Sequence, residues 1–227
     1  MSAPALGTPA FGPGSAPWRL AHFTRATVAK LVVAACRMRF LGEDNLPAHG
    51  GYILACNHVS LLDPVVLWAG SPRPIHIIAK QELFDMPVMG WVAPRFWALP
   101  IRRGTADREA IRRASALLKH GELVGIFPEG TRKREGEPGS EPGDARAGVA
   151  LIAVHAGVPV VPVGIYGTQR VAHTGLRLPR FRRVTFSYGA PVYPDDFSEL
   201  GRRERLDAMT AEIMRSIAFQ RAVAEKE

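Results

Sequence analysis

The sequence predicts one α/β domain with a mixed, largely buried β-sheet flanked by helices. Short apolar runs typical of buried strands alternate along the chain with longer segments of helical periodicity. A chain of 227 residues is long enough to bury a full core. The composition, 47% hydrophobic and 22% charged, is that of a globular protein rather than a disordered one.

The first forty residues divide into two parts. Residues 1–18 contain no charged side chain, and proline and glycine recur through them, so a flexible tail is expected. They lack the basic start and the continuous apolar core of a secretory signal peptide. Residues 19–40 place basic and apolar side chains at roughly helical spacing, which predicts an N-terminal amphipathic helical segment that associates with a membrane. Residues 41–227 then form the main domain.

The first half of this domain predicts strands and helices in alternation. The apolar runs 51–56 and 74–80 are expected strands, and a helix starts between them at about Pro64, because proline is favoured in a first helical turn. Residues 105–120 predict an amphipathic helix whose apolar face carries Ile111, Ala114, Leu117 and Leu118. A glycine ends that helix, and 122–127 follows as a buried strand.

The second half begins with a polar Gly/Pro-rich loop at 134–145. Residues 147–169 carry no Asp, Glu, Lys or Arg and are long enough to cross a bilayer, but a glycine and two prolines interrupt them. A helix over about 146–156 and a buried strand at 158–167 explain them better, so no transmembrane helix is expected. The chain then predicts one more strand and an amphipathic C-terminal helix, at 183–189 and about 202–223.

The charge and the metal-binding residue types limit the possible partners. A net charge of +8 favours an anionic partner: lipid headgroups, a phosphorylated substrate or nucleic acid. The sequence has no zinc finger, RNP-like aromatic motif or basic zipper, so nucleic acid is not expected. Cys36 and Cys56 lack CxxC spacing and the seven histidines lack HExxH spacing, so neither a disulfide framework nor a metal site is expected. A reducing, cytosolic-side environment fits best.

Two titratable groups stand where a predicted strand passes into a helix. His58 has the side chain whose pKa best suits general-base work near neutral pH, and the Asp63 carboxylate can hold its second nitrogen. On one continuous helix the two side chains would point about 140° apart. They can meet if His58 lies in the turn before the helix and Asp63 in its first turn, which Pro64 supports. The alternative is a helix-capping aspartate beside an ordinary turn histidine.

A second cluster, FPEGTR at 127–132, follows another predicted strand. Arg132 offers a planar guanidinium suited to a phosphate, and Glu129 could hold that guanidinium or contact a substrate hydroxyl. The alternative is a solvated Glu–Arg pair in a surface turn. Arg102 and Arg103 follow a further predicted strand and are candidates for a second phosphate contact.

In this order the motifs resemble the glycerolipid acyltransferase family, in particular its bacterial 1-acylglycerol-3-phosphate acyltransferases. NHVSLLD at 57–63 matches the family's H-x4-D motif, and FPEGTR at 127–132 matches its Glu-Gly-Thr-Arg motif. VPVVPVGI at 158–165 is similar to its final apolar motif. The resemblance covers roughly Phe40 to Gly189 and implies a glycerol-3-phosphate acyltransferase-like fold for the domain 41–227.

The resemblance also implies a reaction. His58, oriented by Asp63, would deprotonate the sn-2 hydroxyl of 1-acylglycerol-3-phosphate, which would attack the thioester of acyl-CoA or an acylated carrier protein and give phosphatidic acid for phospholipid biosynthesis. It implies that Arg132 and Arg103 bind the acceptor's phosphate and that Glu129, Gly130 and Thr131 shape that site. No covalent acyl-enzyme is needed, and Cys56 is interpreted as a small buried strand residue rather than a nucleophile.

The expected partners are therefore a lysophospholipid acceptor, an acyl thioester donor and an anionic membrane surface, with no metal, no nucleic acid and no cofactor beyond the donor. The basic residues that could face anionic lipid are Arg170, Arg177, Arg180, Arg182 and Arg183. The protein is expected at the cytoplasmic face of the cell membrane, as a peripheral or monotopic protein. The alternatives are an acyltransferase for another acceptor, namely glycerol-3-phosphate, another lysophospholipid or a glycolipid, or a lipid-binding protein without catalysis.

Overall fold

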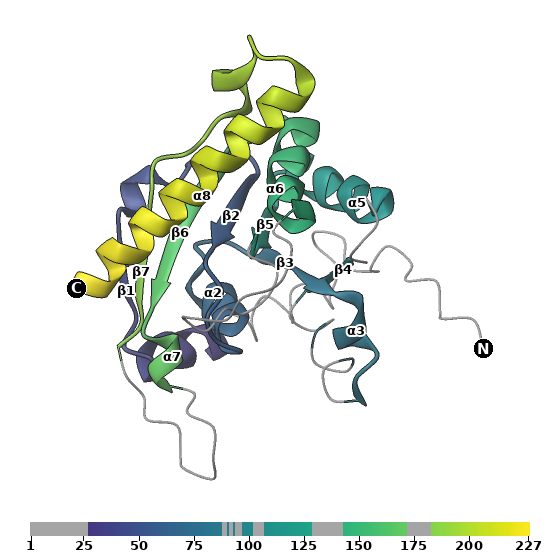
Figure 1. Cartoon of the computed structure of the whole chain (residues 1–227). Coiled ribbons are helices and arrows are strands. Elements are labelled where there is room, and N and C mark those ends of the chain that lie inside the picture. The colour runs from purple at the N-terminus through teal and green to yellow at the C-terminus, as the bar shows by residue number, and fades with distance from the viewer. Residues whose placement is uncertain are drawn as a thin grey trace.

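The structure is a computed structural model that describes residues 27–87, 90, 93, 97–101, 107–128, 143–171 and 183–227. Within these residues, seven strands form one sheet in the order β1-β7-β6-β2-β5-β3-β4 (Figure 1). Their bounds are β1 (Arg39–Leu41), β2 (Tyr52–Cys56), β3 (Ile75–Lys80), β4 (Leu99–Ile101), β5 (Leu123–Ile126), β6 (Val160–Tyr166) and β7 (Thr185–Tyr188).

The sheet is mixed, as predicted. Neighbouring strands are parallel everywhere except between β6 and β7, so β1 and β7 run opposite to the other five. The central pairs are well buried, with Ile53 beside Val124 on β5 and Val160 on β6. Parallel strands of this kind need coverage on both faces, which explains their almost continuous apolar sequences.

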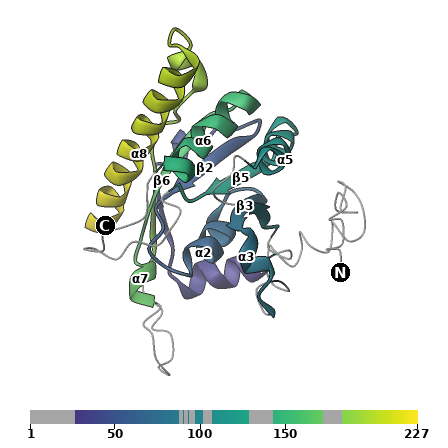
Figure 2. The ribbon, with the colours of Figure 1, turned by 45° about the vertical axis from the view of Figure 1, so that its right-hand side comes forward.

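Helices cover both faces of the sheet (Figure 2). Their bounds are α2 (Asp63–Gly70), α3 (Gln81–Phe84), α5 (Arg108–Lys119), α6 (Gly143–Ala156), α7 (Thr168–Val171) and α8 (Arg202–Lys226), with short 3₁₀ turns η1 (Glu43–Asn45) and η3 (Pro194–Phe197). Residues 27–35 are also helical. One apolar core joins α2 and residues 27–35 to one face, and a second core joins α5, α6 and α8 to the other.

The alternation of side chains along β2 assigns its residues to the two cores. Leu54 and Cys56 belong to the core under α2, whereas Ile53 and Ala55 belong to the core under α6 and α8. The sheet with helices on both faces forms three layers, and α8 packs closely against β6 in one of the outer layers. A Cβ atom at Gly164 would overlap the backbone of Gln220, so a glycine is needed where α8 crosses the strand.

The predicted helical segment 19–40 differs from the structure at its C-terminal end. The helix ends at residue 35, Arg37 adopts a positive φ of 44°, and Arg39–Leu41 form β1 against β7. The prediction of helix through residue 40 is therefore wrong for residues 36–40, and the predicted boundary between 40 and 41 falls inside β1. Exposed Arg37 and Arg39 alternate with core-packed Met38 and Phe40, a period of two typical of a strand. Residues 1–26 lie outside the described part, so the tail and the membrane segment stay predictions.

The remaining helices match their predicted positions with shifted ends. Asp107 caps α5 by accepting a hydrogen bond from the Ala110 backbone N–H at 3.0 Å, so this helix starts later than predicted. The C-terminal helix α8 extends three residues further than expected, to Lys226. Among the described residues, no helix is both long and apolar enough to span a bilayer.

Candidate active site

The end of β2 carries the candidate catalytic pair. Strands β2, β3, β5 and β6 are parallel, so they finish at one end of the sheet, called here the carboxyl end. Open α/β sheets bind ligands at this end. His58 lies two residues after β2, in the turn that leads to α2.

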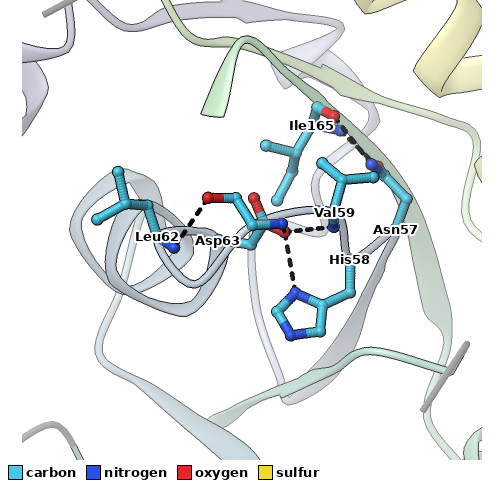
Figure 3. A network of polar contacts seen from close by, with 7 residues as sticks. Asn57, His58, Val59, Leu62, Asp63 and Ile165 are labelled. Carbon is cyan, nitrogen blue, oxygen red and sulfur yellow. Dashed lines mark hydrogen bonds and ion pairs between the residues drawn. The ribbon is translucent and has the colours of Figure 1, made fainter. Parts of the chain in front are cut away.

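Asp63 and His58 contact each other directly (Figure 3). The His58 Nδ1 atom is 2.9 Å from Asp63 Oδ2. Asp63 is the first residue of α2 and is fully buried, whereas the His58 side chain is 17% exposed. The geometric expectation, a histidine in the turn and an aspartate at the helix start, is therefore met. The catalytic roles of the two residues stay predictions.

The Asp63 carboxylate is held by the turn itself. The backbone N–H groups of Val59 and Ser60 each donate a hydrogen bond to Asp63 Oδ2 at 2.7 Å. The Leu62 N–H donates to Ser60 Oγ at 3.2 Å, which closes the same turn. Val59 and Ser60 precede α2, and the N-cap position of that helix is Leu62, which makes no side-chain capping bond. The helix-capping alternative for Asp63 is therefore wrong: one oxygen binds His58 and supports the turn that carries it.

This geometry decides the tautomer of His58. A carboxylate oxygen that receives three hydrogen bonds acts as an acceptor, so Nδ1 carries the hydrogen that it shares with Asp63. In the neutral imidazole Nε2 then holds the lone pair, as a general base requires. The ring lies against Phe127, with centroids 4.5 Å apart at 34°. Phe127 follows β5 and is the first residue of the second motif.

Asn57 is a structural residue of the site that the sequence did not reveal. Its side chain accepts a hydrogen bond from the Ile165 N–H at 2.7 Å and donates one to the Ile165 carbonyl at 2.9 Å (Figure 3). Asn57 is 1% exposed, and Ile165 is fully buried on β6. The pair fastens the turn before His58 to the neighbouring strand. Only the adjacency of β2 and β6, which the sequence does not show, could have revealed this role.

Replacing Asn57 by alanine should destabilise the fold. The change leaves the N–H and the carbonyl of buried Ile165 without their partners, and we expect a loss of about 2–3 kcal/mol in the free energy of unfolding. Urea unfolding measures it. Asn45→Ala is the matched control, because Asn45 makes one such bond, to the Tyr188 carbonyl at 2.9 Å, and should lose about 1 kcal/mol. Equal losses in the two variants would contradict the double role of Asn57.

Cys56 is a buried strand residue, as interpreted from the sequence. It is fully buried in the core under α2, and burial raises the pKa of its thiol well above the usual value, with the Asp63 charge adding to the shift. The thiolate, which is the nucleophilic form, is therefore disfavoured. Among the described residues, no group of three His, Cys, Asp or Glu side chains is placed to hold a metal ion.

The other predicted site residues lie outside the described part of the chain. These residues are Arg103, Glu129, Gly130, Thr131 and Arg132. The described chain reaches Ile101 at the end of β4 and resumes only after Arg103; after β5 it reaches Pro128. The phosphate-binding roles of these residues therefore stay predictions.

Comparison with known proteins decides the family. Residues 37–166 match the Acyltransferase family model, more than half of the chain. The chain belongs to the acyltransferase family. The range matched by this acyltransferase model includes His58, Asp63, Arg103 and the whole second motif.

Relatives of this acyltransferase come from several bacteria. The chain is 34% identical over 174 residues to the 1-acyl-sn-glycerol-3-phosphate acyltransferase of Bacillus subtilis, covering 76% of this chain and 82% of that relative. It is 35% identical over 135 residues to the protein of the same name from Pseudomonas aeruginosa, covering 58% of this chain and 50% of the relative. The crystal structure of the 1-acyl-sn-glycerophosphate acyltransferase PlsC from Thermotoga maritima is similar, with a TM-score of 0.65, 28% identity and coverage of 91% of this chain and 83% of that one. The acyltransferase fold is thus shared over most of the chain.

Proposed function

We propose that the protein transfers a fatty acyl group from a thioester donor to the sn-2 hydroxyl of 1-acylglycerol-3-phosphate, giving phosphatidic acid for phospholipid biosynthesis. The observation that carries the proposal is the 2.9 Å contact between His58 and Asp63 at the carboxyl end of the sheet. It occurs in a chain whose relatives in Bacillus subtilis and Thermotoga maritima are named for this reaction.

The chemistry follows from the His58 tautomer. Nε2 takes the proton of the acceptor hydroxyl while its oxygen attacks the thioester carbonyl, and Asp63 stabilises the imidazolium that forms. The tetrahedral intermediate then collapses, the carbon–sulfur bond breaks, and the imidazolium returns its proton to the departing thiolate. The products are the new ester and the free thiol. Phe127 against the ring restricts where the imidazole can turn, so the base stays in place between turnovers.

The acceptor's phosphate is assigned to arginines outside the described residues. Arg132 and Arg103 would bind it, with Glu129, Gly130 and Thr131 shaping the site, as the family resemblance implies. The donor, acyl-CoA or an acylated carrier protein, is a substrate, and no other cofactor is expected. The enzyme would work at the cytoplasmic face of the membrane as a peripheral or monotopic protein, since acceptor and product are both amphiphiles.

Replacing Arg132 by alanine should weaken acceptor binding selectively. Loss of a charge-assisted contact to phosphate should raise KM for 1-acylglycerol-3-phosphate by about tenfold or more while KM for the acyl donor changes little. Initial rates with each substrate varied in turn give both constants. Arg112→Ala is the control, because Arg112 is exposed on α5 and pairs with Glu109. Equal increases in both KM values for Arg132→Ala would argue against a headgroup role.

The reaction itself is tested by acyl transfer from palmitoyl-CoA. Lysophosphatidate is compared with glycerol-3-phosphate and lysophosphatidylcholine, for the unmodified chain and for His58→Ala. Formation of phosphatidate that depends on His58 supports the proposal. Transfer to another acceptor would change the substrate, and no transfer from either palmitoyl-CoA or an acylated carrier protein would favour a lipid-binding protein without catalysis.

A further inference from the structure

The strand that leads to Arg103 is held by only a short ladder. Among the described strands, β4 lies at an edge of the sheet, where β3 pairs with it through Leu99, Pro100 and Ile101 (Figure 1). Proline has no main-chain N–H, so at most two residues of β4 can donate a hydrogen bond to β3. The position of β4 therefore depends on contacts outside the ladder.

The position of β4 matters because of the residue that follows it. Strand β4 is parallel to β3 and ends at Ile101, opposite Lys80, so it finishes at the carboxyl end of the sheet, where His58 also lies. Arg103, which the proposed function assigns to the acceptor's phosphate, follows Ile101 by two residues. Two residues span at most about 7 Å of chain, so a displacement of β4 displaces the start of the segment that contains Arg103.

A largely buried histidine contacts the turn before β4. His76 lies on β3 beside Val124 of β5, and its side chain is 18% exposed. It shares a sheet face with Ile78, which packs in the core under α5 and α6. The main chain of Trp97 accepts a hydrogen bond from the His76 ring. The rings of His76 and Trp97 also lie close, with centroids 6.1 Å apart at 37°.

Trp97 has a backbone conformation that needs such a restraint. Its φ is 54°, in the left-handed region that residues other than glycine rarely adopt. A residue keeps this conformation only where its surroundings hold it. The Ala98 N–H donates to the Ala93 carbonyl at 3.1 Å, which closes the turn on itself. His76 adds a restraint from a neighbouring strand, and so it ties the turn to the interior of the sheet.

His76 makes this contact as a neutral imidazole. Burial lowers the pKa of His76, although the hydrogen bond to the Trp97 main chain opposes this shift. Near neutral pH the ring is therefore uncharged and has a single N–H, which the Trp97 main chain receives. The Nε2 atom of His76 is 4.0 Å from Glu122 Oε2, which is too far for a hydrogen bond. Among the described residues, Trp97 is thus the hydrogen-bond partner of the ring.

We propose that His76 is a positioning residue for the acceptor's phosphate: it holds Trp97, this contact fixes β4, and β4 in turn places Arg103. The inference rests on the proposed function, which assigns the phosphate to Arg103. His76 stands near the start of β3, away from the carboxyl end of that strand, so it acts on the site through Trp97 and β4 rather than by touching the reacting atoms.

Replacing His76 by phenylalanine removes the ring N–H and keeps an aromatic ring beside Trp97. We expect KM for 1-acylglycerol-3-phosphate to rise about three- to tenfold, because a loosely placed Arg103 loses part of a charge-assisted contact. The kcat and the KM for the acyl donor should change little, whereas a loss of folded enzyme would lower kcat instead. His76→Asn and His76→Gln place an NH₂ group near the positions of Nδ1 and Nε2, and one of the two should restore the KM. Asn45→Ala is the matched control, because it also removes one side-chain hydrogen bond to a main-chain carbonyl, that of Tyr188, toward the opposite edge of the sheet. Its KM values should be normal.

A double-mutant cycle tests the route through Arg103. Arg103→Ala should raise the KM for the acceptor by itself, and adding His76→Phe should raise it no further, because the side chain that His76 positions is then absent. If the two increases multiply instead, His76 affects the acceptor by another route and the inference is overturned. An unchanged KM in His76→Phe overturns it as well.

Hydrogen exchange and equilibrium binding separate this inference from the proposed function. In His76→Phe the amides of Leu99 and Ile101 should exchange at least about fivefold faster, with no change in β2, and unchanged exchange in β4 would overturn the inference. If the unmodified chain transfers no acyl group, the same cycle is measured by calorimetry as Kd for 1-acylglycerol-3-phosphate. Weaker binding in His76→Phe that disappears in the Arg103→Ala background supports the inference although the proposed function has failed. No binding of this lipid overturns both.

Discussion

Replacing His58 by alanine is expected to lower kcat by about 10² to 10⁴, the contribution of a well-placed general base. The acceptor hydroxyl would then lose its proton to water, while the substrates still bind. The His58 ring contacts Phe127 and is partly exposed, so the change removes little core packing, and the protein should unfold at nearly its normal temperature. Initial-rate kinetics with lysophosphatidate and palmitoyl-CoA measure the loss.

A second histidine provides the control for this experiment. His120 lies at the end of α5, where its Nδ1 is 2.8 Å from the Ala116 carbonyl, and it is exposed. His120→Ala should leave kcat unchanged. Turnover of His58→Ala within a fewfold of the unmodified enzyme would remove the general-base assignment.

Replacing Asp63 by asparagine and by alanine should give two different losses. In the asparagine variant, the amide oxygen is expected to take the place of Oδ2, because the Val59 and Ser60 N–H groups donate there. Nδ1 of His58 then still donates to an oxygen and keeps its tautomer, and only the negative charge is lost. We expect kcat to fall by about 10²-fold, since a hydrogen bond to a charged partner is worth about 1.5–3 kcal/mol.

Asp63→Ala removes the orientation as well as the charge. Its kcat should fall to about the level of His58→Ala, because residues that act as a unit are not additive. The asparagine variant should also be less stable by about 1–3 kcal/mol, since its amide NH₂ would occupy the buried position of Oδ1, which has no hydrogen-bond partner within the described residues. Urea unfolding and initial rates measure the two effects separately.

Asp196→Asn is the control for a carboxylate that only accepts hydrogen bonds from the backbone. Asp196 Oδ2 accepts a hydrogen bond from the Tyr193 N–H at 3.3 Å, at the start of η3 and far from His58 in the fold. Turnover should not change. If Asp63→Asn also turned over at the normal rate, Asp63 would only support the turn before α2 and would have no part in the reaction.

The sequence predicted the elements better than their arrangement. Apolar runs such as 51–56 and 122–127 were recognised as strands because a strand buried on both faces leaves a continuous apolar signature. The short strand β1 was not recognised, because it has only three residues and directly follows a segment of helical periodicity. The order of the strands depends on contacts between distant segments, and no local pattern encodes them.

In the candidate site, too, the local geometry could be predicted from the sequence and the contacts between distant segments could not. The meeting of His58 and Asp63 could be predicted because it is local: five residues, a turn and a proline define it. The hydrogen bonds from two backbone N–H groups to Asp63 Oδ2 form only with the backbone angles of this turn. The hydrogen bonds between Asn57 and Ile165 form only because β6 lies beside β2. Neither is visible in the residue types alone.

The pairing of β1 with β7 has a consequence for biosynthesis. These strands come from opposite ends of the chain, and within the described residues β1 pairs with no other strand. Translation delivers β1 early and β7 late, so on the ribosome the helix 27–35 and β1 must wait for almost the whole protein before they can join the sheet. Closing so long a loop is entropically unfavourable, and it makes this contact a late event in folding. The N-terminal segment, with its exposed Leu31, is therefore presented to chaperones or to a nearby membrane throughout synthesis.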